Sequence, residues 1–484
     1  MKRRDFLFAG AGAAVLSGAP VNPTQRYLAR IQALNPSLRA VIEVNPDALK
    51  IAAQSMRGPL QGVPVLLKDN IETADGMQTT AGSLSLERSP VPKDAFLVTR
   101  LRAAGAVILG KTNMSEWANF RSTHAVSGWS GRGGQTRNPY ALDRNPSGSS
   151  SGSAVAVAAN LCAIAVGTET DGSIVSPASV NGIDGIKPTV GLISRSGIIP
   201  ISASQDTAGP MARTVREAAI LLSVLSGVDP EDPATADAQH AEIDYTKTLD
   251  AKGLRGARLG IARKSFGFNA DVDQLMEGCI AHLRSEGAEI IDPIELPPDA
   301  KISEHEQEVL LYEFKAGLND YLKRRGSKET LASLIEFNNR ESRREMPYFR
   351  QELFEQAEKK GPLSDPAYQS ARAECLRLTR TDGIDPAFAK HRLDALVAPT
   401  SCLAWLTDWI NGDAANGGCS TPPAVAGYPH ITVPAGFVHG LPAGISFFGL
   451  PWSEPTLLRI AYGFEQTTHA RREPRMLATA RNTP

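Results

Sequence analysis

The sequence predicts an α/β fold built on a largely parallel or mixed β-sheet, and two observations lead to this prediction. Short apolar runs rich in Val, Ile and Leu alternate with longer segments of helical periodicity along most of the chain, a pattern typical of strands joined through helices. The 484 residues are 42% hydrophobic and 21% charged, which is the composition of a globular chain that buries a large core.

The expected elements follow one another from the N-terminal part of the chain onward. Short β-branched runs predict strands, which we expect at 62–67, 106–109, 164–166, 258–262, 290–294, 393–399, 431–434 and 444–448. Amphipathic periods that begin near Pro, Thr or Asp predict helices, which we expect at 27–34, 47–56, 95–104, 155–159, 214–225, 272–286 and 455–469.

Residues 303–382 differ from the rest because they are rich in charge and helical by pattern, with breaks at Gly326 and Pro347. We expect them to form a helical insertion that covers one side of the sheet. No repeat or low-complexity linker interrupts the chain, so residues 22–484 are predicted to be a single domain.

The first 21 residues resemble a twin-arginine export signal. Lys2, Arg3 and Arg4 precede a short apolar run, residues 6–19, that ends in small residues suited to a peptidase. The run is too short to span a bilayer as a mature helix. The sequence therefore predicts an exported, periplasmic protein with no membrane segment in its mature form.

Charge and cysteine content exclude several classes of partner. A net charge of -1 offers no electrostatic basis for binding nucleic acid, so we expect a small or neutral partner. The five cysteines are scattered and form no CxxC pair, which argues against a disulfide framework or a zinc site; pairing of Cys402 with Cys419 stays open. No metal site is predicted.

Residues 105–112 match the phosphate-loop pattern GxxxxGK[ST] by letter. That motif requires a flexible loop between a strand and a helix, whereas the four middle residues here are Ala-Val-Ile-Leu and predict a strand. We interpret the match as fortuitous.

Residues 145–175 carry the strongest chemical signal. Two glycine-rich loops, at 148–153 and 167–172, flank a small-residue apolar segment, so two loops can bring the hydroxyls of Ser149 and Ser173 to one place. The core sequences AVAVAAN and IAVG that lie between these loops argue against a flexible linker. Amide hydrogens of the second loop could converge on an anion.

Lys68 is the candidate base for these hydroxyls. It follows the apolar run 63–67, which would remove water from its amine; an exposed lysine is neutral only about once in a thousand at neutral pH, and burial lowers the pKa. None of the eight histidines lies in the glycine-rich loops. A Ser-His-Asp triad assembled from distant residues stays an alternative.

These motifs together resemble the amidase signature family. The resemblance covers nearly all of the chain after the signal, and within the family the pattern is most similar to bacterial peptide amidases, with Glu169, Asp171 and Val175 where the broader pattern has Asp, Gly and Arg. The matching segments are Gly62-Val63-Pro64 before Lys68-Asp69, 110–113, 117–121, 132–139, 147–153, 167–175, Lys187-Pro188-Thr189, 198–207 and 424–434.

The resemblance implies an amidase signature fold, with a large mixed central sheet covered by helices on both faces. It implies Ser173 as nucleophile, Ser149 as proton relay after a cis peptide bond, and Lys68 as terminal base. The implied oxyanion hole consists of the backbone amides of Thr170, Asp171, Gly172 and Ser173.

The implied reaction hydrolyses a carboxamide to a carboxylate and ammonia through an acyl-enzyme. The expected substrate is a peptide with a C-terminal amide, and the scheme needs no metal or organic cofactor. A general amidase on small aliphatic or aryl amides, and a catalytically inactive amide-binding protein, are the alternatives. Oligomeric state stays open.

Overall fold

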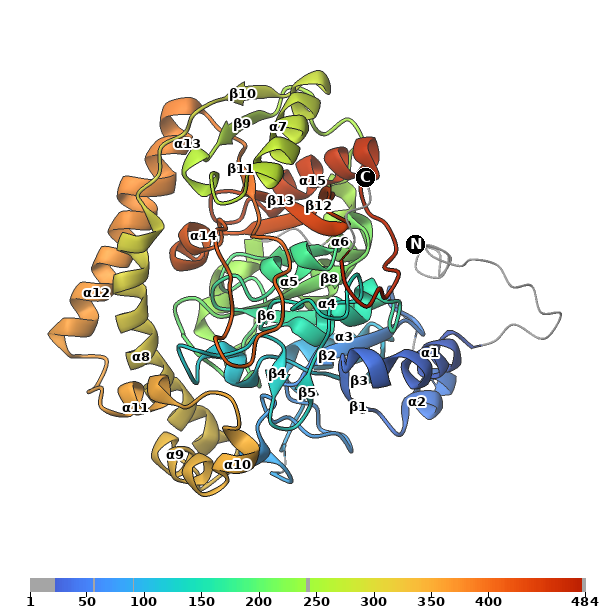
Figure 1. The fold of residues 1–484 in the computed structure, drawn as a ribbon, viewed down its shortest axis with the longest axis vertical. Helices are drawn as coiled ribbons and strands as arrows, with labels where there is room; N and C mark the ends of the chain where they lie inside the picture. The colour runs from blue at the N-terminus through green and yellow to red at the C-terminus, as the bar shows by residue number, and fades with distance from the viewer. Residues whose placement is uncertain (1–21, 55–56, 90, 241–243, 481–484) are drawn as a thin grey trace.

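The computed structural model describes residues 22–54, 57–89, 91–240 and 244–480, so the predicted export signal at 1–21 lies outside the described residues. The centre of the fold is an eleven-stranded sheet (Figure 1) in the order β1-β3-β2-β6-β8-β7-β12-β13-β11-β9-β10. Its strands are β1 (Val41–Val44), β2 (Pro64–Lys68), β3 (Val107–Thr112), β6 (Ile164–Glu169), β7 (Asp184–Lys187), β8 (Thr207–Ala212), β9 (Arg258–Ile261), β10 (Glu289–Ile291), β11 (Ala395–Pro399), β12 (His430–Val438) and β13 (Leu441–Phe448).

The sheet is mixed, which confirms the predicted fold class. Strands β3, β2 and β6 run parallel to one another near one end, and β11, β9 and β10 do so at the other. All pairings between β6 and β11 are antiparallel, as is the edge pairing of β1 with β3. A separate small hairpin consists of β4 (Trp129–Ser130) and β5 (Gly134–Gln135).

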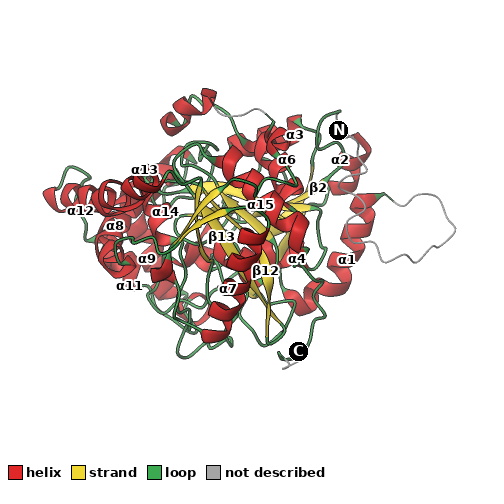
Figure 2. Ribbon diagram, turned by 90° about the horizontal axis from the view of Figure 1, so that it is seen from above, coloured by secondary structure: helices red, strands yellow, loops and turns green. Residues whose placement is uncertain are grey.

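Helices cover both faces of the sheet (Figure 2). Along β2, Val65 and Leu67 join one core cluster and Leu66 joins the other, as the period of two in a strand requires. The first cluster includes residues of α3 (Phe96–Ala103), α6 (Val215–Leu225), α7 (Ala270–Ser285) and α15 (Glu454–Thr468). The second includes residues of α1 (Pro23–Leu38), α2 (Ala48–Gln54), α4 (Ser151–Ala158) and α5 (Val175–Val180).

The segment predicted to be a helical insertion lies along one edge of the molecule, at the left in Figure 1. Its long helix α8 ends just before Gly326, whose φ of +79° suits glycine at a helix end, and Pro347 follows α10. The helices of this segment are α8 (Asp299–Arg324), α9 (Leu331–Arg340), α10 (Ser342–Glu345), α11 (Glu352–Glu358), α12 (Pro366–Leu376) and a π-helical segment at Arg377–Ile384. The helices that follow it are α13 (Asp385–His391) and, after β11, α14 (Thr421–Ala426).

The structure differs from the sequence prediction beside the serine-rich loops. Residues 167–169 were expected in a loop but belong to β6, because Thr168 and Glu169 pair with Ala208 and Thr207 of β8. Helix α4 begins at Ser151 rather than at Val155. Strands β1, β7 and β8 and helices α5 and α14 were not expected. Short 3-10 helices occur at Leu84–Leu86, Glu116–Asn119, Pro233–His240, Tyr245–Thr248 and Arg263–Ser265.

The phosphate-loop match at 105–112 forms strand β3, as predicted. Lys111 is fully buried, and its Nζ donates to Thr79 Oγ1 (2.8 Å) and to the carbonyl of Ile71. Its amine therefore makes its contacts inside the protein core.

All five cysteines lie within the described residues and are free thiols, which rules out the Cys402–Cys419 pair in this structure. None of the helices in the described ranges is long and apolar enough to cross a membrane.

Candidate active site

The three predicted catalytic residues meet at one edge of the sheet. Lys68 is the last residue of β2, and Ser173 follows the end of β6, which pairs with β2 in parallel. Because parallel strands end at the same edge, both residues are brought there together. Ser149 lies two residues before α4, which contacts both strands.

Lys68 is held by three oxygen atoms. Its Nζ lies 2.7 Å from Ser149 Oγ, 2.8 Å from Thr168 Oγ1 and 3.1 Å from the Thr168 carbonyl oxygen. The side chain is fully buried, and burial lowers its pKa to about 7, although the nearby carboxylates of Glu169 and Asp206 act in the opposite direction. About half of Lys68 is therefore neutral at pH 7.

The two serine loops are connected through the backbone. The peptide bond between Gly148 and Ser149 is cis, and the N–H of Ser150 donates to the carbonyl of Ser173 (3.1 Å). A Cβ atom at position 148 would collide with the Ser115 hydroxyl, so any larger residue here would have to displace that hydroxyl. Ser149 is fully buried whereas Ser173 is 8% exposed, which makes Ser173 the hydroxyl that a substrate can reach.

Among the described residues, the Ser173 hydroxyl has no hydrogen-bond partner, and the backbone N–H groups of Thr170, Asp171, Gly172 and Ser173 have no acceptor. The φ of Gly172 is +75°, a conformation that favours glycine. Unpaired amides are rare in folded proteins. Four in succession beside a reachable serine suit a site that binds an anionic oxygen.

Sequence reasoning missed Thr168 and Asn70. Thr168 supplies two of the three oxygen atoms around Lys68, and Asn70 Nδ2 donates to Thr168 Oγ1 (3.0 Å). The three N–H groups of a charged lysine therefore match three acceptors. Thr168 is 100 residues from Lys68 in the chain, and only the parallel pairing of β2 with β6 places them together.

The structure does not favour a histidine base. Within the described chain, no histidine is hydrogen-bonded to Ser149 or Ser173. His430 is fully buried, its Nε2 lies 2.5 Å from Ser446 Oγ, and burial lowers its pKa to about 3. The base with the contacts to accept a proton from Ser149 is Lys68.

A cavity of about 450 Å³ adjoins the base of the site. Thr168, Thr170 and Asp206 line one side of it, and Gly317 and Tyr321 of α8 line another. Its wall is largely apolar, with residues 198–201 contributing Ile-Ile-Pro-Ile. Charged side chains, among them Glu72 and Arg195, also line the cavity.

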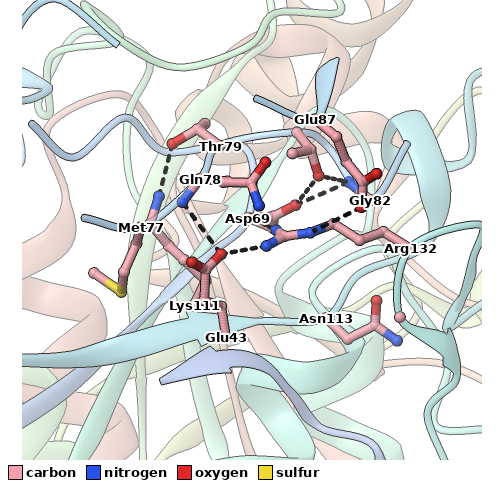
Figure 3. Close-up of polar contacts among 12 residues, drawn as sticks. Glu43, Asp69, Met77, Gln78, Thr79, Gly82, Glu87, Lys111, Asn113 and Arg132 are labelled. Atoms are coloured by element: carbon pink, nitrogen blue, oxygen red, sulfur yellow. Dashed lines mark hydrogen bonds and ion pairs between the residues drawn. The ribbon is translucent and has the colours of Figure 1, made fainter. Parts of the chain in front are cut away.

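A buried ionic cluster supports the residue next to Lys68. Asp69 is fully buried, and Arg132 donates to it (3.2 Å) and to Glu43, as Figure 3 shows. Thr80 Oγ1 and the N–H of Gly82 (3.1 Å) also donate to Asp69. Burial raises the pKa of Asp69, and Arg132 opposes this rise. The cluster connects β1, the end of β2 and the loop that carries Arg132.

Replacing Arg132 with methionine is expected to lower the free energy of unfolding by about 3 to 5 kcal/mol, because it leaves the buried Asp69 carboxylate without its nearest cation. Denaturant titration measures this change. The exposed pair Arg377–Glu374 (2.8 Å) supplies the matched control: Arg377→Met should leave the midpoint of the denaturant titration nearly unchanged, because water screens an exposed ion pair. Equal losses in the two variants would show that the cluster has no special stabilising role.

Comparisons with known proteins agree with this geometry. A sequence model of the Amidase family matches residues 22–458. The chain is 44% identical over 472 residues to a probable amidase of Arabidopsis thaliana, covering 93% of this chain and 87% of the relative. It is 35% identical over 472 residues to a subunit of the glutamyl-tRNA(Gln) amidotransferase from a Roseiflexus species, covering 93% of each chain.

Solved structures of similar proteins lead to the same family. The native peptide amidase of Stenotrophomonas maltophilia superposes with a TM-score of 0.89 at 53% identity, covering 94% of each chain. The complex of the peptide amidase PAM with the competitive inhibitor chymostatin superposes with a TM-score of 0.91, also at 53% identity, covering 94% of this chain and 95% of the other. The chain therefore belongs to the amidase signature family of carbon–nitrogen hydrolases.

Proposed function

We propose that this amidase uses Ser173 as its nucleophile, Ser149 as a proton relay and Lys68 as the terminal base. The observation that carries the proposal is the buried Lys68 amine, 2.7 Å from Ser149 Oγ. Neutral Lys68 takes the proton of Ser149 while Ser149 takes that of Ser173. The Ser173 oxygen then attacks the carboxamide carbon.

In this proposal the free amides of residues 170–173 bind the oxyanion that forms. Losing one such donor costs about 3 kcal/mol of transition-state stabilisation in comparable enzymes. The proton held by Lys68 returns through Ser149 to the leaving nitrogen, and ammonia departs from the acyl-enzyme. Water then attacks the ester and gives a proton to the same relay, and the relay returns that proton to Ser173 Oγ as the bond to the acyl carbon breaks and the acid is released. Side chains of this protein carry each proton transfer, so the scheme needs no cofactor.

We further propose a peptide with a C-terminal carboxamide as substrate. The 53% identity to a peptide amidase over 94% of the chain supports this choice, and it exceeds the 35% identity to the amidotransferase chain. The charges of Lys93 and Arg195 beside the cavity are already paired with Glu231 and Asp232. A neutral amide therefore suits the cavity, and helix α8 would form its outer wall.

Two alternatives remain. A general amidase on small aliphatic or aryl amides would use the same residues. An inactive amide-binding protein is disfavoured because Lys68, Ser149 and Ser173 are all present and Lys68 contacts Ser149 directly.

Export by the twin-arginine route stays a prediction from Arg3 and Arg4. Fractionation of producing cells tests it: the protein should be recovered in the periplasm, and recovery in the cytoplasm would contradict the prediction.

The substrate proposal predicts a preference that can be measured. Ammonia release from a blocked dipeptide amide should exceed that from a simple aliphatic amide by at least about tenfold in kcat/KM, since each additional 1.4 kcal/mol of transition-state binding gives a factor of ten. Turnover of the aliphatic amide alone would contradict the peptide assignment and favour the general amidase. Release from neither amide would favour the inactive binding protein.

A further inference from the structure

The loop between β6 and α5, residues 170–173, carries the four unpaired amides, and the structure shows what closes it. Glu169, the last residue of β6, lies at one end of the loop. Its Oε2 accepts the N–H groups of Ile174 (2.7 Å) and Val175 (3.0 Å) at the other end. One carboxylate oxygen therefore holds both ends of the loop together while the four amides between them stay free.

This carboxylate is buried. Glu169 is 1% exposed, and burial raises its pKa while the charge of Lys187 opposes the rise. An ionised carboxylate in such a place requires a compensating charge. Lys187, the last residue of β7, is the cation whose charge most strongly lowers the pKa of Glu169.

Lys187 is also fully buried, and the only hydrogen bond of its side-chain amine within the described chain is to the carbonyl of Pro188 (3.2 Å). The carboxylates that act on it belong to Glu169, Glu454 and Asp171. Each of these has one buried oxygen without a hydrogen-bond partner among the described residues, and none lies within ion-pair distance of Lys187. Lys187 thus acts on these carboxylates through its charge in the buried interior rather than through a direct ion pair.

We propose that Glu169 and Lys187 are positioning residues, which hold the loop 170–173 so that its amides face the oxygen of the reacting carbonyl. The inference rests on the proposed function, because it requires an oxyanion at these amides. Glu169 closes the loop through the amides of Ile174 and Val175, and Lys187 keeps the Glu169 carboxylate ionised. Neither residue touches the substrate.

A pair of ligands that differ only in oxyanion formation tests this role. With a peptide aldehyde, Ser173 Oγ bonds to the aldehyde carbon, the carbonyl π electrons move to the oxygen, and the Ser173 proton passes through Ser149 to Lys68. The corresponding peptide alcohol binds in the same place without this bond. The ratio of the two Kd values therefore measures bond formation at Ser173 together with binding of the oxyanion, and not the binding of the rest of the peptide.

Glu169→Leu removes the loop closure. We expect it to weaken aldehyde binding and to lower kcat by about 100-fold or more, as the loss of an oxyanion donor does, while the Kd of the alcohol and KM change by less than about threefold. Glu169→Gln keeps an oxygen that accepts N–H groups but loses the charge that Lys187 stabilises, so its aldehyde affinity should lie between that of wild type and that of Glu169→Leu. Lys187→Met should move the aldehyde-to-alcohol ratio in the same direction as Glu169→Leu.

Glu217 supplies the matched control. It is a buried carboxylate on α6 that accepts the N–H of Arg213 (3.2 Å) and pairs with its guanidinium (3.4 Å), but it has no contact with the loop 170–173. Glu217→Leu should lower stability and leave the aldehyde-to-alcohol ratio unchanged.

Three results would overturn the inference. They are an unchanged ratio in folded Glu169→Leu, an equal change in Glu217→Leu, and equal losses of aldehyde and alcohol affinity. If Glu169→Leu does not fold, an unchanged ratio in Lys187→Met decides against the inference. A wild-type protein that releases no ammonia and does not distinguish the aldehyde from the alcohol would instead refute the proposed function.

Discussion

Ser173→Ala is expected to lower kcat by about a millionfold, as removal of the nucleophile does in serine hydrolases, because it removes the reachable hydroxyl that follows the unpaired amides of the loop 170–173. Ser149→Ala should cost nearly as much, since it cuts the contact to Lys68. The double variant should be no worse than either single one, because the relay acts as a unit. Ammonia release from a peptide amide measures all three.

Ser153→Ala is the matched control for these substitutions. Ser153 lies in the same serine cluster and is equally buried, but its hydroxyl lies 2.8 Å from Thr112 Oγ1 and donates to the carbonyl of Val166 (3.2 Å). We expect its loss to change kcat by less than about tenfold, in keeping with the net worth of an ordinary hydrogen bond. A loss as large as that of Ser173→Ala would mean that the serine cluster acts through stability rather than through chemistry.

The rate is expected to depend on pH through Lys68. The pKa of Lys68 is lowered to about 7 by burial, and only the neutral amine can accept a proton. Acidification below pH 7 should therefore reduce kcat/KM about tenfold per pH unit, and the profile should level off above this value. The groups whose charges act on Lys68 are Glu169 and Asp206, and both oppose the lowering.

The variant Lys68→Ala tests whether Lys68 is the group whose titration causes this pH dependence. The variant should retain a small residual rate without the limb near pH 7, because the group that titrates has been removed. Lys111 and Lys187 are also buried, with pKa values lowered to about 8, and each is retained in the variant. Persistence of the limb in Lys68→Ala, or a rate that falls as the pH rises from 6 to 8, would contradict the assignment of Lys68 as base.

Much of the fold could be predicted from the sequence where local pattern and tertiary role agree. Strands such as β2 and β3 are nearly continuous apolar runs, as expected of strands buried on both faces. Strand β8 reads Thr-Ala-Gly-Pro-Met-Ala, and Pro and Gly within a run argue against a strand. Its pairing with β6 and β7 forms it nevertheless, which no local signal indicates.

The candidate site shows the same contrast between residues that a local sequence pattern indicates and residues that only tertiary contacts place. Lys68, Ser149 and Ser173 were predictable because each stands in or beside a motif of small residues or at the end of an apolar run. Thr168 was not assigned a role, because its partner Lys68 comes from another strand. Glu169 was not assigned one either, because nothing in the sequence shows that its carboxylate turns back onto the amides of Ile174 and Val175. Spacing along the chain reports which residues share a loop. It does not report which strands become neighbours.

The central claim is that an acyl-enzyme forms on Ser173, and intact-protein mass spectrometry after rapid acid quench tests it most directly. Mixing the protein with a blocked dipeptide amide should add the mass of the dipeptide acyl group, and peptide mapping should place it on Ser173. The same treatment of Ser173→Ala should give no adduct. An adduct on another residue would contradict the mechanism. So would ammonia release from the wild-type protein without any covalent species, at quench times short enough to trap the intermediate.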